Sequence, residues 1–139
     1  MQGDGIRLGL LLRQAHRRAA LDLDRALAPL GISGRHFGVL LLLDRDGAST
    51  QRDLLAQTGG DKAGMQRTIV DLESRGLIRR EPDASDRRLL TLTLTDAGRT
   101  LFAQAARAAS VVADDLTADL NGAELGQLVL LLQRVARRG

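Results

Sequence analysis

Residues 58–99 decide the fold, and they read TGGDKAGMQRTIVDLESRGLIRREPDASDRRLLTLTLTDAGR. The first part of this stretch places Met65, Ile69 and Leu72 at the spacing of one buried helix face. An aspartate just before these residues and a glycine just after them are the residue types that begin and end helices. The pattern therefore predicts a helix over 62–75.

A hairpin with a charged tip follows this helix directly. Residues 77–81 predict one strand, and leucine alternates with threonine over 90–94, which predicts a second strand with one buried face. Residues 82–86 have the composition of a turn. The tip carries Asp86, Arg87 and Arg88.

Most of the remaining chain predicts helices. Apolar spacing and cap residues give the ranges 6–27, 51–58, 97–119 and 123–138, with a central helix running from Ser33 to Asp46. Residues 47–50 predict either a brief strand or an extended link. We therefore expect a mainly α fold with a small β-wing, in which a winged helix-turn-helix module (about 32–96) is flanked by dimerisation helices (about 6–30 and 97–138).

Composition narrows the possible classes of protein. The 139 residues fit a single domain, or one that shares its core with a second copy. Apolar residues make up 44% of the chain, but its only aromatic residues are Phe37 and Phe102, so the core must be built from leucine, alanine and valine. Cysteine is absent, which excludes disulfides and thiolate ligands. No apolar run approaches membrane-spanning length and no signal peptide is recognisable, so we expect a cytoplasmic protein.

The charge is basic but close to balance. The net charge is +3, and Lys62 is the only lysine among 20 basic residues. Residues 50–90 hold 8 basic and 7 acidic side chains. Nucleic-acid binding therefore requires the positive charge to be sorted onto one face of the molecule.

The outward face of the 62–75 helix has side chains that suit DNA. In a helix-turn-helix the second helix lies in the major groove, with its N-terminal residues at the base edges. Glutamine pairs with adenine, arginine or lysine with guanine, and alanine contacts the thymine methyl group. The candidates are Lys62, Ala63, Gln66 and Arg67. The alternative for this segment alone is an ordinary amphipathic helix with a solvated face.

The hairpin tip suits the minor groove, because a narrow minor groove concentrates negative potential and attracts arginine. We expect Asp86 to brace one of the two arginines beside it by an ion pair. Arg52, Arg79 and Arg80 are candidates for phosphate contacts. Taken alone, the tip can also be read as a solvated charge cluster at a turn.

Together, these residues resemble a known family. The matching segments are Arg52-Asp53-Leu54, Arg67, Leu72-Glu73-Ser74-Arg75-Gly76-Leu77-Ile78, Asp83 to Arg88, and Leu94-Thr95-Asp96-Ala97-Gly98. In this order they resemble the multiple antibiotic resistance regulator (MarR) family over nearly the whole chain. The resemblance implies a homodimeric winged-helix regulator that binds double-stranded DNA, with its terminal helices at the dimer interface and Arg88 in the minor groove. The chain departs from the family pattern at Gly60 and Gly64.

The resemblance also implies a small ligand, often aromatic and anionic, bound between the dimer helices and the winged module. The candidate pocket residues are His16, Arg17, His36, Phe37 and Leu41. For the two histidines, an ordinary polar position at a helix edge is the alternative. No histidine spacing supports a metal site, and we expect neither a cofactor nor enzymatic activity.

The sequence therefore predicts a homodimeric transcription regulator, most simply a repressor, that binds a pseudo-palindromic duplex. Two other readings remain open. A winged helix can serve as a protein-interaction module without specific DNA binding, and the near-neutral central segment permits that role. A small hydrolase or transferase would need a pocket with convergent acid and base groups.

Overall fold

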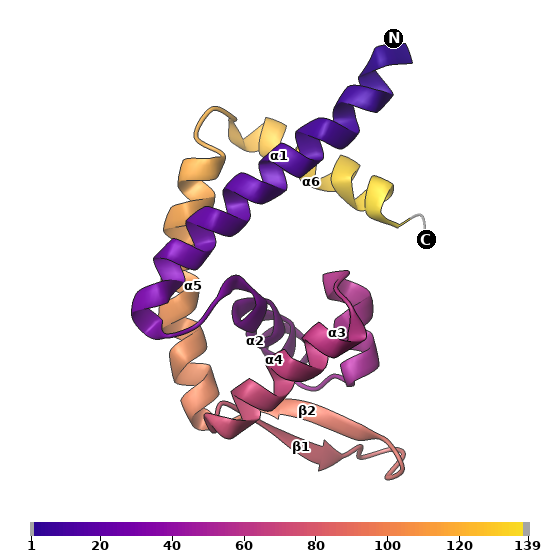
Figure 1. The fold of residues 1–139 in the computed structure, drawn as a ribbon, viewed down its shortest axis with the longest axis vertical. Coiled ribbons are helices and arrows are strands. Elements are labelled where there is room, and N and C mark those ends of the chain that lie inside the picture. Colours follow the sequence, from indigo (N-terminus) through magenta and orange to yellow (C-terminus); the bar gives the residue numbers. More distant parts are fainter. Residues whose placement is uncertain (1, 138–139) are drawn as a thin grey trace.

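The computed structural model describes residues 2–137, which form six α-helices, one 3-10 turn and a two-stranded sheet. In chain order the elements are α1 (Gln2–Leu27), η1 (Ala28–Leu30), α2 (Gly34–Asp46), α3 (Gln51–Thr58), α4 (Lys62–Ser74), β1 (Ile78–Pro82), β2 (Leu90–Leu94), α5 (Asp96–Leu116) and α6 (Gly122–Ala136). In Figure 1, α1 and α6 lie at one end of the molecule with both termini, the winged module lies at the other, and α5 runs between them. The predicted mainly α fold with a β-wing is confirmed.

Side-chain caps explain where several helices begin. The hydroxyl of Thr50 accepts from the Asp53 N–H at the start of α3, and the hydroxyl of Thr95 accepts from the Gly98 N–H at the start of α5. The Asp61 carboxylate accepts from the Gly64 N–H at 2.6 Å, which fixes the start of α4. These are the short polar residues that local sequence marks as N-caps.

Two helix ends differ from the prediction by several residues. Helix α1 begins at Gln2, four residues before the expected start. Helix α5 ends at Leu116 and not at about residue 119, and the chain continues as a turn in which the Leu120 N–H donates to the Thr117 carbonyl. The expected end of the last helix at Arg138 lies outside the described residues.

The sheet is an antiparallel hairpin whose register pairs Ile78 with Leu94 and Pro82 with Leu90. An isolated bridge between Ser49 and Leu92 adds a third short segment. This bridge resolves the alternative that the sequence left open for residues 47–50. It joins the link after α2 to the wing and so ties the base of the wing to the helical core.

Gly98 allows the start of α5 to pack closely against the backbone at Leu77, between α4 and β1. A Cβ atom at this position would lie 2.0 Å from the backbone oxygen of Leu77, a distance that no side chain can adopt. The backbone N–H of Thr95 also donates to the Leu77 oxygen, at 3.1 Å. Glycine is therefore required where α5 leaves the wing.

The winged half has a closed core. Leu40, Leu54, Ile69 and Leu72 are fully buried, and residues from α2, α3, α4, both strands and α5 share one cluster. The ring of Phe37 stacks on that of Phe102 with centroids 5.7 Å apart, which joins α2 to α5. This core fixes the position of α4 beside the wing.

The terminal helices are open by comparison. No side chain of α6, residues 122–136, is buried, and Leu130 is 63% exposed. In α1 the exposed apolar residues include Ile6, Leu10 and Leu11. Among residues 2–137 no single helix is long and apolar enough to cross a membrane, although 3–30 and 34–46, which meet at an 83° bend, pass that test together.

Candidate nucleic-acid interface

The predicted faces of α4 agree with the structure. Met65, Ile69 and Leu72 point into the core, whereas all four proposed base-contacting residues are exposed. They are Lys62, Ala63, Gln66 and Arg67. Helix α4 thus presents a polar face with donors and acceptors at its N-terminal end, the end that reads bases in a helix-turn-helix.

Helix α4 has a side-chain hydrogen bond within its own first turns and an ion pair to the wing near its end. At its start, the Thr68 hydroxyl donates to the Gly64 carbonyl within the buried side of the helix. Near its end, Glu73 accepts from Arg80 at 3.0 Å, and both side chains are partly shielded from solvent. The second contact joins the helix to β1, so α4 and the wing behave as one unit.

The turn of the wing is organised by two carboxylates. Asp83 accepts from the backbone N–H groups of Ser85 and Asp86 and from the Ser85 hydroxyl. The pKa of Asp83 is lowered, chiefly by the hydrogen bond from the Ser85 side chain. This network closes the turn between β1 and β2 and places Asp86, Arg87 and Arg88 at the tip of the wing.

The predicted brace at the tip is present. The Arg88 guanidinium donates from Nε to the Asp86 carboxylate at 3.1 Å, and the Arg88 backbone N–H donates to the same oxygen. The hydrogen bond from the Arg88 side chain is the main reason that the pKa of Asp86 is lowered. The Arg88 side chain is nevertheless 92% exposed, so it is directed by Asp86 and remains free to meet a partner.

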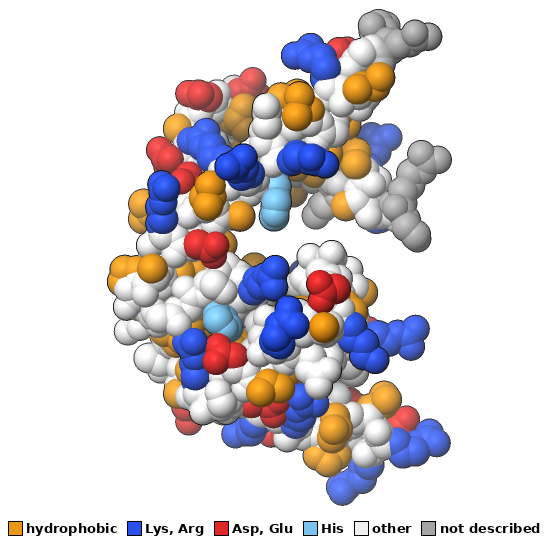
Figure 2. All heavy atoms as spheres, in the orientation of Figure 1, with side chains coloured by type: hydrophobic (Ala, Val, Ile, Leu, Met, Phe, Trp, Pro, Cys, Tyr) orange, Lys and Arg blue, Asp and Glu red, His pale blue; other side chains and the backbone are white. Residues whose placement is uncertain are grey.

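The other proposed DNA contacts lie at the surface. Arg87 is exposed at the tip, and Arg52 is exposed on α3. Arg79 pairs with Glu81 at 2.5 Å, and Arg80 is held by α4 as described above. In Figure 2, basic side chains project at the wing end of the molecule, interspersed with acidic ones. Arg79 and Arg80 must therefore exchange or share a carboxylate partner to meet phosphate.

A cavity of about 700 Å³ lies between α1, the start of α2 and the turn before α4. Its lining includes His16 and Leu23 from α1, Arg35 from α2, and Asp61 and Thr68 at α4. Of the five expected ligand residues, His16 lines this cavity.

The other four expected ligand residues lie elsewhere. Phe37 is buried in its stack, and His36 contacts Asp71 through its ring nitrogen. Arg17 and Leu41 are at the surface, and neither is among the residues that line the cavity. A ligand role for these four residues stays a prediction.

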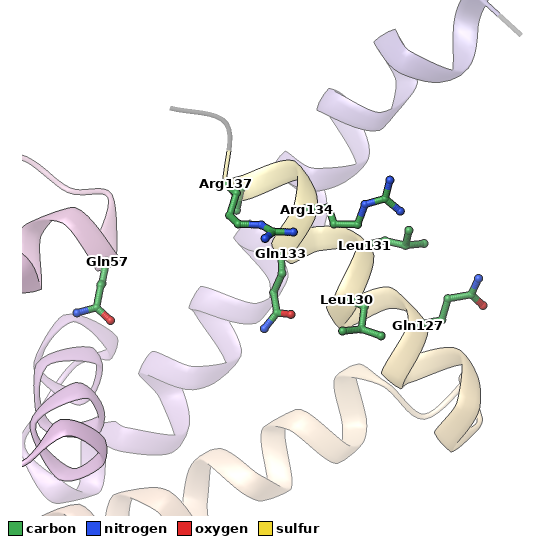
Figure 3. A pocket seen from close by; sticks show the side chains of 8 residues that line it. Gln57, Gln127, Leu130, Leu131, Gln133, Arg134 and Arg137 are labelled. Atoms are coloured by element: carbon green, nitrogen blue, oxygen red, sulfur yellow. The ribbon is translucent and has the colours of Figure 1, made fainter.

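A second open cavity, of about 910 Å³, separates α3 from α6 (Figure 3). Gln57 faces it from α3, and residues of α6, among them Leu130, Leu131 and Arg134, line the opposite side. Figure 2 shows the molecule hollowed between its helical end and its winged end. The leucines on this side of α6 therefore remain exposed within the single chain.

Sequence reasoning missed Arg35. Its Nη1 atom lies 3.4 Å from the place where a Cβ on Gly64 would be, and Nη2 of Arg67 lies 3.7 Å from the same point. Two guanidinium groups thus converge over the start of α4. The signal was the interior glycine, since a Cβ at position 64 would lie 3.1 Å from Oδ1 of Asp61 and within van der Waals contact of Arg35.

A polar helix exposed beside an arginine-tipped hairpin, both fixed to one core, defines a winged helix-turn-helix protein. Residues 30–89 match the model of the MarR family. Over this segment, the winged module, the chain is similar to the MarR family.

Individual known proteins are similar to nearly the whole chain. The HTH-type transcriptional repressor NicR of Pseudomonas putida is 27% identical over 128 residues, which are 92% of this chain and 81% of NicR. A mutant of MarR from E. coli, solved in complex with operator DNA, is 26% identical with a TM-score of 0.81, and the match covers 97% of each chain. CouR from Rhodococcus jostii RHA1, solved with p-coumaroyl-CoA, is 27% identical with a TM-score of 0.89 over 95% of this chain and 93% of CouR.

Proposed function

We propose that the protein is a homodimeric, cytoplasmic transcription repressor that binds a pseudo-palindromic DNA duplex and releases it when a small molecule binds. The observation that carries this function is the joint placement of the exposed face of α4 and the exposed Arg88 on one rigid winged half. The similarity to a repressor and to a structure containing operator DNA supports the same role.

Each subunit places the start of α4 in a major groove. Gln66 and Arg67 read base edges there, because their amide and guanidinium groups match adenine and guanine. Arg88 enters the adjacent minor groove, where its direction is set by Asp86. Arg52, Arg79 and Arg80 contact phosphates and fix the register.

The dimer forms through the terminal helices. Their exposed leucines and valines on α1 and α6 are apolar surface that a second copy can cover. A two-fold axis then places the two α4 helices on half-sites about one helical turn, ~10 bp, apart or a multiple of it.

The small molecule binds in the cavity between α1 and α4. Because this cavity is lined both by a terminal helix and by the recognition helix, its occupant can change how the two halves sit together. Arg35 gives the cavity a cationic group for an anionic ligand. The similarity to CouR, solved with p-coumaroyl-CoA, is consistent with an aromatic, anionic ligand class.

Selection of bound duplexes from a random pool tests the function directly. We expect an inverted repeat whose half-sites lie about one helical turn apart, and affinity that falls steeply with salt, because basic residues displace counterions from phosphate. Binding that is insensitive to salt, with no enriched sequence, would favour the protein-interaction module instead.

Two substitutions separate the roles of helix and wing. Arg88→Ala should weaken binding on all duplexes of similar groove shape, because it removes a contact to the minor groove. Gln66→Ala should instead relax base preference at one position by about 1–3 kcal/mol. Equal loss on every sequence for both variants would contradict the assigned roles.

A further inference from the structure

The turn between α1 and α2 is joined to the recognition helix by a closed set of polar contacts, here called the turn–helix ring. Its members are Gly31, Ser33, His36, Asp71 and Arg75. The Ser33 backbone N–H donates to Nδ1 of His36 at 3.0 Å, and Nε2 of His36 lies 2.7 Å from Oδ2 of Asp71. Arg75 contacts the same Asp71 oxygen at 3.0 Å and donates through Nη1 to the Gly31 carbonyl.

The hydrogen bonds fix the tautomer of His36. Because Nδ1 accepts an N–H hydrogen bond, the ring hydrogen of the neutral imidazole must be on Nε2, where it donates to Asp71. The His36 side chain is only 15% exposed, so this contact is largely shielded from water. A bond of this kind needs one ring orientation, and His36 is thereby fixed between the turn and α4.

The ring connects the two halves of the molecule. Asp71 and Arg75 lie one turn apart at the C-terminal end of α4. Asp71 contacts His36 at the start of α2, and Arg75 donates to the Gly31 carbonyl in the turn that follows α1. On the other side of that turn, Asp24 of α1 accepts from the Gly34 N–H at 2.7 Å. These hydrogen bonds, together with the backbone between Ser33 and Gly34, therefore link the terminal helix α1 to the recognition helix.

We propose that the turn–helix ring sets the orientation of α4 relative to the dimerisation helices, and so determines which half-site spacing the dimer accepts. This inference rests on the proposed function. His36, Asp71 and Arg75 are positioning residues, because none of them belongs to the face of α4 that meets bases. Base preference is set by Gln66 and Arg67, and spacing preference is set by the ring.

The experiment measures affinity for three duplexes that carry the same half-sites at the selected spacing, one base pair shorter and one base pair longer. One base pair rotates a half-site by about a tenth of a turn, so a rigid dimer should discriminate against both altered duplexes. We expect Asp71→Ala to reduce that discrimination by roughly fivefold or more, a usual size for coupling between sites. Discrimination against base substitutions at the selected spacing should be unchanged.

Asp46→Ala is the matched control. It removes a carboxylate of similar exposure from an exposed ion pair with Arg45 at the end of α2, away from the ring. We expect it to keep the wild-type spacing preference. His36→Gln is the conservative variant, because its amide offers one acceptor and one donor and can restore part of the preference that His36→Leu loses.

Equal loss of affinity on all three duplexes, or an unchanged spacing preference, in both Asp71→Ala and His36→Leu would overturn the inference. Urea unfolding of each variant shows whether it is folded. If Asp71→Ala does not fold, the spacing preference of His36→Leu tests the inference. If the wild-type protein itself fails to bind DNA, the proposed function is wrong and the inference falls with it. If the wild-type protein discriminates spacing and the variants do so equally, the inference alone is wrong.

Discussion

The winged half and the terminal helices are both rich in leucine, but they differ in how far these side chains are buried. In the winged half, Leu40 and Leu72 are fully buried, and the core is closed within one chain. In the terminal helices, Leu130 is 63% exposed and no residue of 122–136 is buried. The winged half therefore completes its own core within one chain, whereas the terminal helices leave apolar side chains exposed. In the proposed dimer, a second copy covers these side chains.

The largest effect should come from placing a charge on the exposed apolar face of the terminal helices. Leu131 is half exposed on α6 and lines the cavity opposite α3. Leu131→Glu should place a charge in the dimer contact and yield monomers, which lose the second half-site. Affinity for the full site should then fall by about 10²–10⁴-fold, as measured by fluorescence anisotropy alongside sedimentation. A variant that stays dimeric would show that α6 is not the contact.

The next largest effect should come from creating a cavity in the core of the winged half. Leu72→Ala removes a fully buried side chain from the core beneath α4 and should cost about 2–5 kcal/mol of unfolding free energy. Urea unfolding measures this loss. Leu130→Ala, the same substitution on the exposed face, should change the unfolding of the monomer far less. Similar losses for both variants would contradict the division between the halves.

A third substitution tests the docking of α5 on the wing. Gly98→Ala would force a Cβ against the Leu77 backbone, so we expect a loss of about 1–3 kcal/mol or more as the helix shifts. Gly38→Ala, in α2, is the control, since a Cβ there meets nothing within 4 Å. That variant should be stabilised by about 0.5–1 kcal/mol, because alanine favours a helix. The two thermal transitions should therefore move in opposite directions.

The smallest effect lies at the tip of the wing. Removing the Arg88 guanidinium in Arg88→Ala takes away the main hydrogen bond that lowers the pKa of Asp86. The pKa of Asp86 should therefore rise toward the ordinary value for aspartate, which carboxyl NMR titration can follow. The pKa of Asp83 should stay low, because its main partner is the Ser85 side chain. An unchanged Asp86 titration would show that the brace is not formed in solution.

Local features of the fold could be predicted from the sequence because local chemistry determines them. The caps at Thr50, Asp61 and Thr95 lie where short polar side chains precede apolar runs, and the leucine alternation over 90–94 marks a strand. The exposed face of α4 could be predicted because its apolar residues recur at the helical period. The end of α5 could not, because a turn at Thr117 interrupts a pattern that continues to be helical in composition.

Contacts between distant residues could not be predicted in the same way. The pair of His36 with Asp71 joins residues 35 apart in the sequence, and the approach of Arg35 to Gly64 depends on how α2 packs against α4. Of the expected ligand residues, only His16 lines the cavity between α1 and α4. Periodicity gives the apolar face of each helix, but it does not give the angle at which two helices cross.

The central claim is that two copies of this chain bind one DNA duplex, each through α4 and Arg88. Sedimentation equilibrium of the protein with a labelled duplex carrying the selected site tests it most directly. We predict two chains on each duplex, and affinity for an isolated half-site that is far weaker than for the full site. One chain on each duplex, or equal affinity for half-site and full site, would contradict it.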